Sequence, residues 1–331
     1  MTVSVGIVGA GAISKKMHLP VLLSMPDVRV DWLYDRDPAR ASELATAYRV
    51  PHAKAASAAE LPHCDVLLLA IPVEARAEYL EIVARQGGSV FCEKPFALTA
   101  AEHRRVADLY PEYLLGCGYP RRFFDSMMTL RYVIAHQWFG PLQRVRIAEG
   151  NRSRASGVDT SFLDGAGAGS GVLTDLGSHS IDLALHLTGA QSFRILECDL
   201  VLDGQVDRRA HARVELREGV AGDRVELDYR VSWLDAQPNR MELEFERATV
   251  FCGLGWNAEV FVGDPRKPGH AFRLISPSQG ARTPNQAFYL EWRAFLDGLV
   301  TRQESIVSAN SAYLTTALVE SLHEYGRRAY A

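Results

Sequence analysis

The sequence has little of what would place it outside the ordinary globular enzymes. Its five cysteines are widely spaced and form no CxxC or Cys/His cluster, which argues against a disulfide framework and a metal site. The 36 Lys and Arg residues are outnumbered by 40 Asp and Glu residues, so the basic surface that attracts nucleic acid is missing. No apolar stretch approaches the roughly 18 residues that span a bilayer, and no basic leader with a cleavage site opens the chain. We therefore expect a cytoplasmic protein with reduced thiols, no metal, and neither nucleic acid nor membrane as a partner.

What is present is a chain of 331 residues, 47% of them hydrophobic, which is long enough for two cores. Its first third alternates strand and helix patterns. The third of these strands is apolar on both faces, as a strand covered by helices must be. This alternation predicts a parallel sheet wound by crossover helices, with strands at residues 3–8, 28–34, 66–71 and 89–92.

After about residue 119 the pattern changes to strict alternation of apolar and polar residues. It runs through 224–233 and again through 241–246, which indicates antiparallel strands with one apolar and one polar face. We therefore predict an α/β domain over residues 1–118, followed by an α+β domain over 119–331. The second domain would contain a large, mostly antiparallel open-faced sheet, with closing helices at about 285–330.

The first candidate site is the turn after the first strand, residues 9–14, which reads GAGAIS. Glycines at its first two positions allow a tight turn and the close approach of a pyrophosphate to a helix N-terminus. Ser14 stands where the dinucleotide fingerprint has its third glycine, so a purely structural turn remains an alternative. On the dinucleotide interpretation the domain has a Rossmann fold, and its cofactor contacts here are Gly9, Gly11, Ala12 and Ile13.

Asp35 closes the second strand, close to the position of the acid that binds the adenosine ribose hydroxyls. Its carboxylate would repel a 2′-phosphate, which favours NAD. Arg36 beside it would either stack on adenine or pair with that phosphate, so NADP stays open. Further cofactor contacts are expected at the end of the third strand, at Ala70, Ile71 and Pro72.

Glu93, Lys94 and Pro95 follow the fourth strand. Ligands of parallel sheets bind outside the carboxyl ends of the strands, so Glu93 and Lys94 are expected at the cofactor crevice. A lysine there would polarise a carbonyl or hydroxyl oxygen. A solvated surface charge is the alternative.

The last candidate site lies in a segment whose helical interpretation spans residues 173–187. Asp175 and His179 stand at i and i+4, on one face of that helix. Gly177, Ser178 and Ser180 are poor helix formers, which indicates that a flat ring, a sugar or a packed helix approaches closely. A buried histidine of the core is the alternative for His179.

Taken together, these motifs resemble those of the glucose–fructose oxidoreductase, inositol dehydrogenase and MocA family, from end to end of the chain. The resemblance implies that Lys94 binds the reacting oxygen, that His179 is the proton donor and acceptor, and that Asp175 contacts the substrate. It adds Tyr119 and Arg122 as substrate contacts, and an open-faced sheet that makes homodimers or homotetramers.

The family implies an NAD(P)-dependent dehydrogenase or reductase that acts on CH–OH groups. Hydride would pass between nicotinamide C4 and a carbinol or keto carbon of a sugar, sugar derivative or cyclitol. Two alternatives stay open: an NAD-dependent elimination or hydrolysis through transient oxidation, and a dinucleotide-sensing regulator. The chain departs from the family at Val73 and Arg76, where the family has an Asn and a nearby His. Arginines near the domain junction would suit an anionic sugar or simply be solvated: Arg121, Arg122, Arg152 and Arg154.

Overall fold

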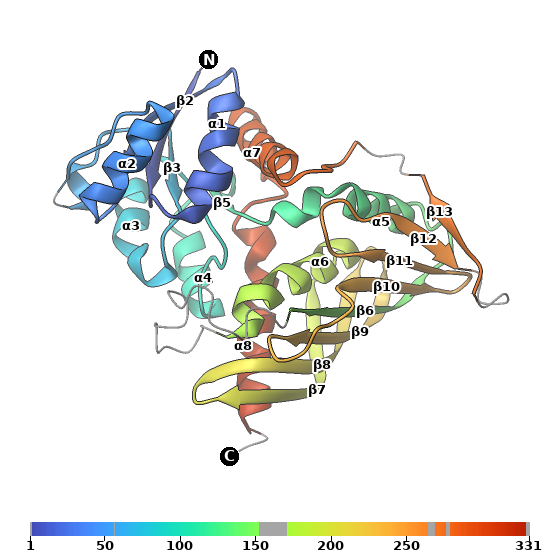
Figure 1. Ribbon diagram of the computed structural model, residues 1–331. Coiled ribbons are helices and arrows are strands. Elements are labelled where there is room, and N and C mark those ends of the chain that lie inside the picture. Colours follow the sequence, from blue (N-terminus) through green and yellow to red (C-terminus); the bar gives the residue numbers. More distant parts are fainter. Residues whose placement is uncertain (1, 56, 152–170, 264–268, 276–278, 329–331) are drawn as a thin grey trace. The chain divides into compact units, whose positions relative to one another are not determined.

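The computed structural model describes residues 2–55, 57–151, 171–263, 269–275 and 279–328. The chain forms two compact units (Figure 1). The first comprises Met1–Pro120 and Pro284–Tyr313, and the second comprises Arg121–Thr283 and Leu314–Ala331. This division differs from the single boundary expected at residue 118, because a segment near the C-terminus returns to the first unit.

That return is explained by aromatic packing. Helix α7 (Pro284–Thr301) carries Trp292, which stacks on Phe91 of β4 (Ser89–Cys92) with ring centroids 4.6 Å apart. Phe295, one turn further along α7, meets the same Phe91 ring edge-on. The burial of these three rings holds α7 in the core of the first unit, although α7 lies far from that unit's strands in the sequence.

The described part of the first unit contains a five-stranded sheet in the order β2-β1-β3-β4-β5, with every pairing parallel. The fold therefore agrees with the wound parallel sheet expected from the sequence. Besides β4, its strands are β1 (Val3–Val8), β2 (Val28–Tyr34), β3 (Val66–Leu69) and β5 (Leu115–Cys117). Besides α7, its α-helices are α1 (Leu19–Ser24), α2 (Pro38–Tyr48), α3 (Ala77–Gln86) and α4 (Ala100–Ala107).

Local chemistry explains where these helices begin. Asp37 caps α2, its side chain accepting from the backbone N–H groups of Ala39 and Arg40, and Pro38 occupies the first turn. Thr99 caps α4 by accepting from the N–H of Glu102 at 3.1 Å. Strand β3 is buried at all four positions, which agrees with its apolar sequence, and it ends two residues before the predicted limit.

The described part of the second unit contains an eight-stranded sheet, ordered β13-β12-β11-β10-β6-β9-β8-β7. Its neighbours pair antiparallel except β6 and β9, which pair parallel. Helix α6 (Ser178–Thr188) packs on β6, β8 and β9 and on α5 (Asp125–Ala135), and Figure 1 shows both helices beside the sheet. The strands are β6 (Leu142–Gly150), β7 (Ser192–Asp203), β8 (Val206–Gly219), β9 (Gly222–Ser232), β10 (Arg240–Phe245), β11 (Thr249–Gly253), β12 (Val260–Gly263) and β13 (Ala271–Leu274).

Strand β9 shows why this sheet has two unlike faces. Val225, Leu227 and Tyr229 are buried, whereas the intervening charged residues are partly exposed. The last helix, α8 (Tyr313–Arg328), packs against β7, where its Gly326 lies close to Leu200. The alternation of apolar and polar residues in the sequence of β9 thus matches the alternation of buried and partly exposed side chains in the structure.

Within the described ranges, no helix combines the length and the apolar character needed to cross a membrane. The same ranges hold no group of three or more His, Cys, Asp or Glu side chains arranged to bind a metal ion.

Candidate functional site

The glycine turn follows β1 directly. Gly9 has φ of 111°, and a Cβ there would lie 2.4 Å from the carbonyl oxygen of Ala70, so only glycine fits. A Cβ on Gly11 would meet no described atom within 4 Å. The first glycine therefore lets the turn pack on the end of β3, and the second leaves the backbone open to an approaching group.

The missing third glycine is Ser14, which is fully buried and whose Oγ donates to the carbonyl of Gly9 at 2.6 Å. This hydroxyl closes the turn from within. Ser14 also begins a π-helical segment, Ser14–His18, that runs into α1. Such segments are rare and occur often at functional sites.

Asp35 fastens the same turn to the end of β2. Its Oδ2 accepts from the N–H of Ala10 at 2.8 Å, and its Oδ1 accepts from the N–H of Asp37 at 2.9 Å. Each carboxylate oxygen has a second lone pair, so the group can still accept bonds from ribose hydroxyls. Arg36 is exposed.

Glu93 and Lys94 follow β4, as expected, and both are half-buried. Glu93 Oε1 lies 2.8 Å from Nε2 of His18, and its Oε2 accepts from the backbone N–H of Lys94 at 3.1 Å. Burial raises the pKa of Glu93, but the hydrogen bond from His18 and the nearby positive charges of Lys94 and Arg76 outweigh it. The net pKa of Glu93 is lowered, so it is a carboxylate.

Arg76 stands where the family pattern has a histidine, and the structure shows what it does. The residue is 3% exposed; its Nε donates to the carbonyl of Ile71 at 2.9 Å and its Nη1 to the carbonyl of Pro95 at 2.7 Å. One guanidinium therefore ties the end of β3 to the turn after β4. Nothing local in the sequence indicates this, because both partners are backbone carbonyls.

In the second unit, Asp175 and His179 lie on a helix that begins with the π-helical segment Leu173–Gly177 and continues as α6. Both side chains are half-buried, so this face is partly open. Asp207 anchors the start of the segment, its Oδ2 accepting from the N–H of Leu173 at 2.8 Å. The π-helical geometry replaces the plain α-helix expected there.

The close neighbour indicated by the poor helix formers is a tyrosine of the sheet. A Cβ on Gly177 would lie 2.9 Å from the hydroxyl of Tyr229, and Ser180 Oγ lies 3.0 Å from that same hydroxyl. The close approach expected at this turn is therefore made by a tyrosine side chain of the sheet, and contact with a ligand ring or sugar at the same turn stays a prediction. Burial raises the pKa of Tyr229, so the hydroxyl stays protonated.

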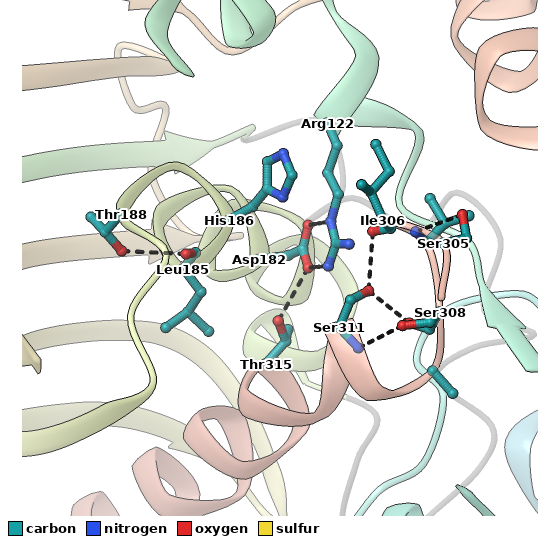
Figure 2. A network of polar contacts seen from close by, with 12 residues as sticks. Arg122, Asp182, Leu185, His186, Thr188, Ser305, Ile306, Ser308, Ser311 and Thr315 are labelled. Carbon is teal, nitrogen blue, oxygen red and sulfur yellow. Dashed lines mark hydrogen bonds and ion pairs between the residues drawn. The ribbon is translucent and has the colours of Figure 1, made fainter. Parts of the chain in front are cut away.

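Two residues expected to contact substrate are instead part of cores. Tyr119 is 1% exposed and packs in the hydrophobic core of the first unit. Arg122 is buried in the second unit, where both its Nε and its Nη2 bond Asp182, the former at 2.8 Å (Figure 2). We therefore leave Tyr119 and Arg122 out of the proposed substrate contacts, because Tyr119 is almost wholly enclosed and the guanidinium of Arg122 is paired with Asp182.

The environment of Arg122 is a buried polar cluster of the second unit. Burial raises the pKa of Asp182, while Arg122 and a hydrogen bond from Thr315 at 3.2 Å oppose that rise. Burial and the neighbouring guanidinium of Arg122 lower the pKa of His186 to about 2, which keeps this imidazole neutral. Figure 2 shows these four side chains together.

Three further arginines were singled out in the sequence, one beside Arg122 and two after β6. Arg121 pairs with Glu149 at 2.8 Å, with side chains 19% and 8% exposed. Arg152 and Arg154 lie outside the described residues.

The parallel sheet with its glycine turn and the mostly antiparallel second sheet together define a two-domain protein whose first domain has a Rossmann fold. Two family models match the chain: the oxidoreductase family with an NAD-binding Rossmann fold over residues 3–114, and the GFO/IDH/MocA C-terminal domain over residues 127–251. The chain belongs to this Gfo/Idh/MocA family of sugar and cyclitol oxidoreductases, as the resemblance of its motifs indicated.

Curated relatives include inositol 2-dehydrogenase of Rhizobium meliloti (strain 1021), 29% identical over 206 residues, which are 61% of this chain and 60% of that protein. Rhizopine catabolism protein MocA of Rhizobium meliloti is 28% identical over 205 residues, 61% of this chain and 62% of that one. The chain thus spans less than two thirds of the length of these relatives. The structure of levoglucosan dehydrogenase in complex with NADH and L-sorbose has a TM-score of 0.84 at 17% identity, over 99% of this chain and 98% of that chain, and shows the shared fold.

Proposed function

We propose that the protein is an NAD(P)-dependent dehydrogenase that transfers hydride between nicotinamide C4 and a carbinol or keto carbon of a sugar, sugar derivative or cyclitol. The observation that carries this proposal lies in the first unit, where an open glycine turn and Lys94 both follow the carboxyl ends of parallel strands. A named relative that oxidises inositol supports a polyol substrate.

The residues of the first unit fit a nicotinamide dinucleotide. The open backbone at Gly11, with Ala12 and Ile13 beginning the helix, suits a pyrophosphate, and the Asp35 carboxylate suits ribose hydroxyls. Ala70, Ile71 and Pro72 at the end of β3 remain proposed cofactor contacts, as do Arg36 after β2 and Glu93 after β4. The negative charge of Asp35 favours NAD over NADP.

The bound dinucleotide supplies the hydride acceptor or donor, and the chain manages the proton and the charge on oxygen. Lys94 binds the oxygen of the reacting CH–OH group and stabilises the negative charge that develops there. His179 takes the hydroxyl proton during oxidation and returns it during reduction. Asp175 contacts the substrate and orients the imidazole of His179.

A homo-oligomer is part of the proposal. The open face of the second sheet carries charges of both signs that pair across strands, such as Arg144 with Glu226 and Glu244, each at 3.3 Å, and Arg213 with Glu197 at 2.9 Å. A face of this kind is self-complementary and suits a two-fold contact. Light scattering should report a multiple of the 36.6 kDa chain. The five free cysteines fit work in the reducing cytoplasm.

A substrate screen tests the function. Purified protein is mixed with NAD and a panel of sugars and cyclitols, and in parallel with NADH and keto sugars, while absorbance at the NADH band is followed. Stoichiometric NADH formation supports the proposal. Product formation without net NADH, at trace NAD, would identify an elimination or hydrolysis instead. Tight NAD binding with no turnover of any compound would identify a sensor.

A further inference from the structure

Three side chains of the first unit form a buried chain of hydrogen bonds that ends at the Lys94 turn. Trp292 Nε1 lies 3.0 Å from Nδ1 of His18, and Nε2 of His18 lies 2.8 Å from Oε1 of Glu93. The side chains of His18 and Trp292 are fully buried, and that of Glu93 is 12% exposed. The other oxygen of Glu93 accepts from the backbone N–H of Lys94.

The direction of each bond in this chain follows from chemistry. An indole nitrogen only donates, so Trp292 obliges His18 Nδ1 to accept and leaves the imidazole proton on Nε2. The Nε2–H group of His18 then donates to Glu93, because a carboxylate can only accept a hydrogen bond. The imidazole is enclosed by Phe288 and Phe91 as well, with ring centroids 5.1 and 6.4 Å away. A second proton on His18 would break the bond from Trp292.

His18 also belongs to the helical segment that directly follows the glycine turn. It is the last residue of the π-helical segment that begins at Ser14, whose hydroxyl closes the Gly9 turn. On the far side of Lys94, Arg76 holds the carbonyl of Pro95. The backbone of the lysine is thus held from both sides.

We propose that His18, kept in its Nε2–H tautomer by Trp292, is a positioning residue that orients Glu93 and through it couples the Lys94 turn to the glycine turn. The importance of Lys94 rests on the function proposed above. The tautomer and its effect on NADH binding do not require turnover. Both are therefore measurable apart from it.

The tautomer is tested by nitrogen-15 spectra of protein labelled at histidine, at pH 7.5. Trp292→Phe removes the donor and keeps a ring against Phe91. Trp32→Phe is the matched control, because Trp32 is equally buried in this unit and its Nε1 bonds no described atom. We expect an unprotonated Nδ1 and a protonated Nε2 of His18 in the wild type and in Trp32→Phe. In Trp292→Phe, the chemical shifts of the two ring nitrogens should move toward each other. A protonated Nδ1 in the wild type overturns the proposal. The His18 signals are assigned by their loss in His18→Gln.

The positioning role is tested by NADH titration and kinetics on variants shown to be folded by circular dichroism. We expect Trp292→Phe and His18→Leu to weaken NADH binding and to lower kcat by about 10–100-fold, the range found when groups that orient a reactive centre are lost. His18→Gln keeps an N–H donor toward Glu93 and should recover most of the kcat lost in His18→Leu. A structural role alone predicts no such rescue and an unchanged kcat in each folded variant.

The two proposals fail separately. If the wild type turns over no substrate, the proposed function fails, while the nitrogen-15 spectra and NADH titrations still decide the role of His18. If folded Trp292→Phe and His18→Leu bind NADH and react like the wild type, the positioning role is wrong and the function stands. Should Trp292→Phe not fold, Glu93→Gln replaces it, because its amide can accept from His18 but its nitrogen cannot accept from the Lys94 N–H.

Discussion

Each unit of this molecule starts a helix with a π-helical segment, Ser14–His18 in the first and Leu173–Gly177 in the second. A serine hydroxyl in the first segment, and one directly after the second, bonds a nearby backbone carbonyl: Ser14 bonds Gly9 at 2.6 Å, and Ser178 bonds Thr174 at 2.7 Å. A π-helical turn inserts one residue and so redirects the side chains around it.

The two histidines associated with these segments have opposite environments. His18 is completely enclosed, and each of its nitrogens has an assigned partner. His179 is half-buried on a partly open face with Asp175, while the inner face of the same helix is held by Tyr229 and Asp207. Enclosure suits a group that holds others in place, and partial exposure suits a group that must exchange a proton with a ligand.

The sharpest test of this contrast is His179→Gln. If His179 is the acid and base, the rate should fall by about 10²–10⁴-fold while NADH affinity stays near the wild-type value. His136→Gln, an exposed histidine at the end of α5, is the control and should leave the rate unchanged. Near-normal turnover of His179→Gln with the screened substrate would mean that another residue moves the proton.

Lys94→Ala should be at least as harmful as His179→Gln. Because both groups are proposed to act on one oxygen, the double variant should be less impaired than the product of the two single losses. Independent, multiplicative losses would separate the two residues and contradict a shared role.

The buried pair of the second unit is expected to matter for folding rather than for chemistry. Arg122→Met leaves the Asp182 carboxylate unpaired and should lower the free energy of unfolding by about 3–5 kcal/mol, as measured by urea titration. Adding Asp182→Leu should recover much of this loss. The exposed pair of Asp203 and Arg208 is the reference, and Asp203→Ala should cost about 1 kcal/mol or less. Equal losses at the two pairs would contradict the role of burial.

The lowered pKa values of His103 in the first unit and His186 in the second predict a pH dependence of the free energy of unfolding. Burial lowers the pKa of His103 to about 4, against the opposing effect of its bond to Ala309, and that of His186 to about 2. The unfolded chain binds protons on these groups below about pH 6.5 and the folded chain does not, so stability falls as the pH falls.

The free energy of unfolding should fall by up to about 1.4 kcal/mol per pH unit for each such histidine. The contribution of His103 should level off near pH 4. Urea titrations between pH 7.5 and 5 measure it. His103→Gln and His186→Gln, which cannot take up a proton, should each flatten the slope. An unaltered slope in both variants would place the titrating groups elsewhere.

Asp35 should set cofactor preference in the first unit. NAD is expected to bind more tightly than NADP by about 1–3 kcal/mol, the scale of a hydrogen bond to a charged group. Titration of both cofactors measures this, and Asp35→Ser should narrow the difference. Tighter NADP binding by the wild type would show that Arg36 dominates, and Arg36→Ala would then reverse it.

The smallest expected effect concerns the packing behind Asp175 and His179. Gly177→Ala places a methyl group 2.9 Å from the Tyr229 hydroxyl and should cost about 1–3 kcal/mol of stability as an overpacking change. In a Tyr229→Phe background, where that oxygen is gone, the cost should be smaller. Additive costs in the double variant would show that the two residues do not meet.

Much of the fold is predictable because burial imposes its period on the chain. The limits of β1, β2 and β4 agree with the apolar runs, and the helix starts at Pro38 and after Thr99 agree with local capping. The candidate residues Asp35, Lys94 and His179 were found because motifs place them after strands or on a helix face. Their proposed roles await the experiments above.

The sequence by itself determined the strands of the first sheet other than β5, the two kinds of sheet and the residues at strand ends, because these depend on neighbours a few positions apart. Only the tertiary structure decided that Trp292 meets His18 across 274 positions, that Arg122 pairs with Asp182 across 60, and that Arg76 binds two carbonyls. These contacts come from packing between distant segments, where most buried polar groups find a hydrogen-bond partner. A residue type alone does not say which partner that will be.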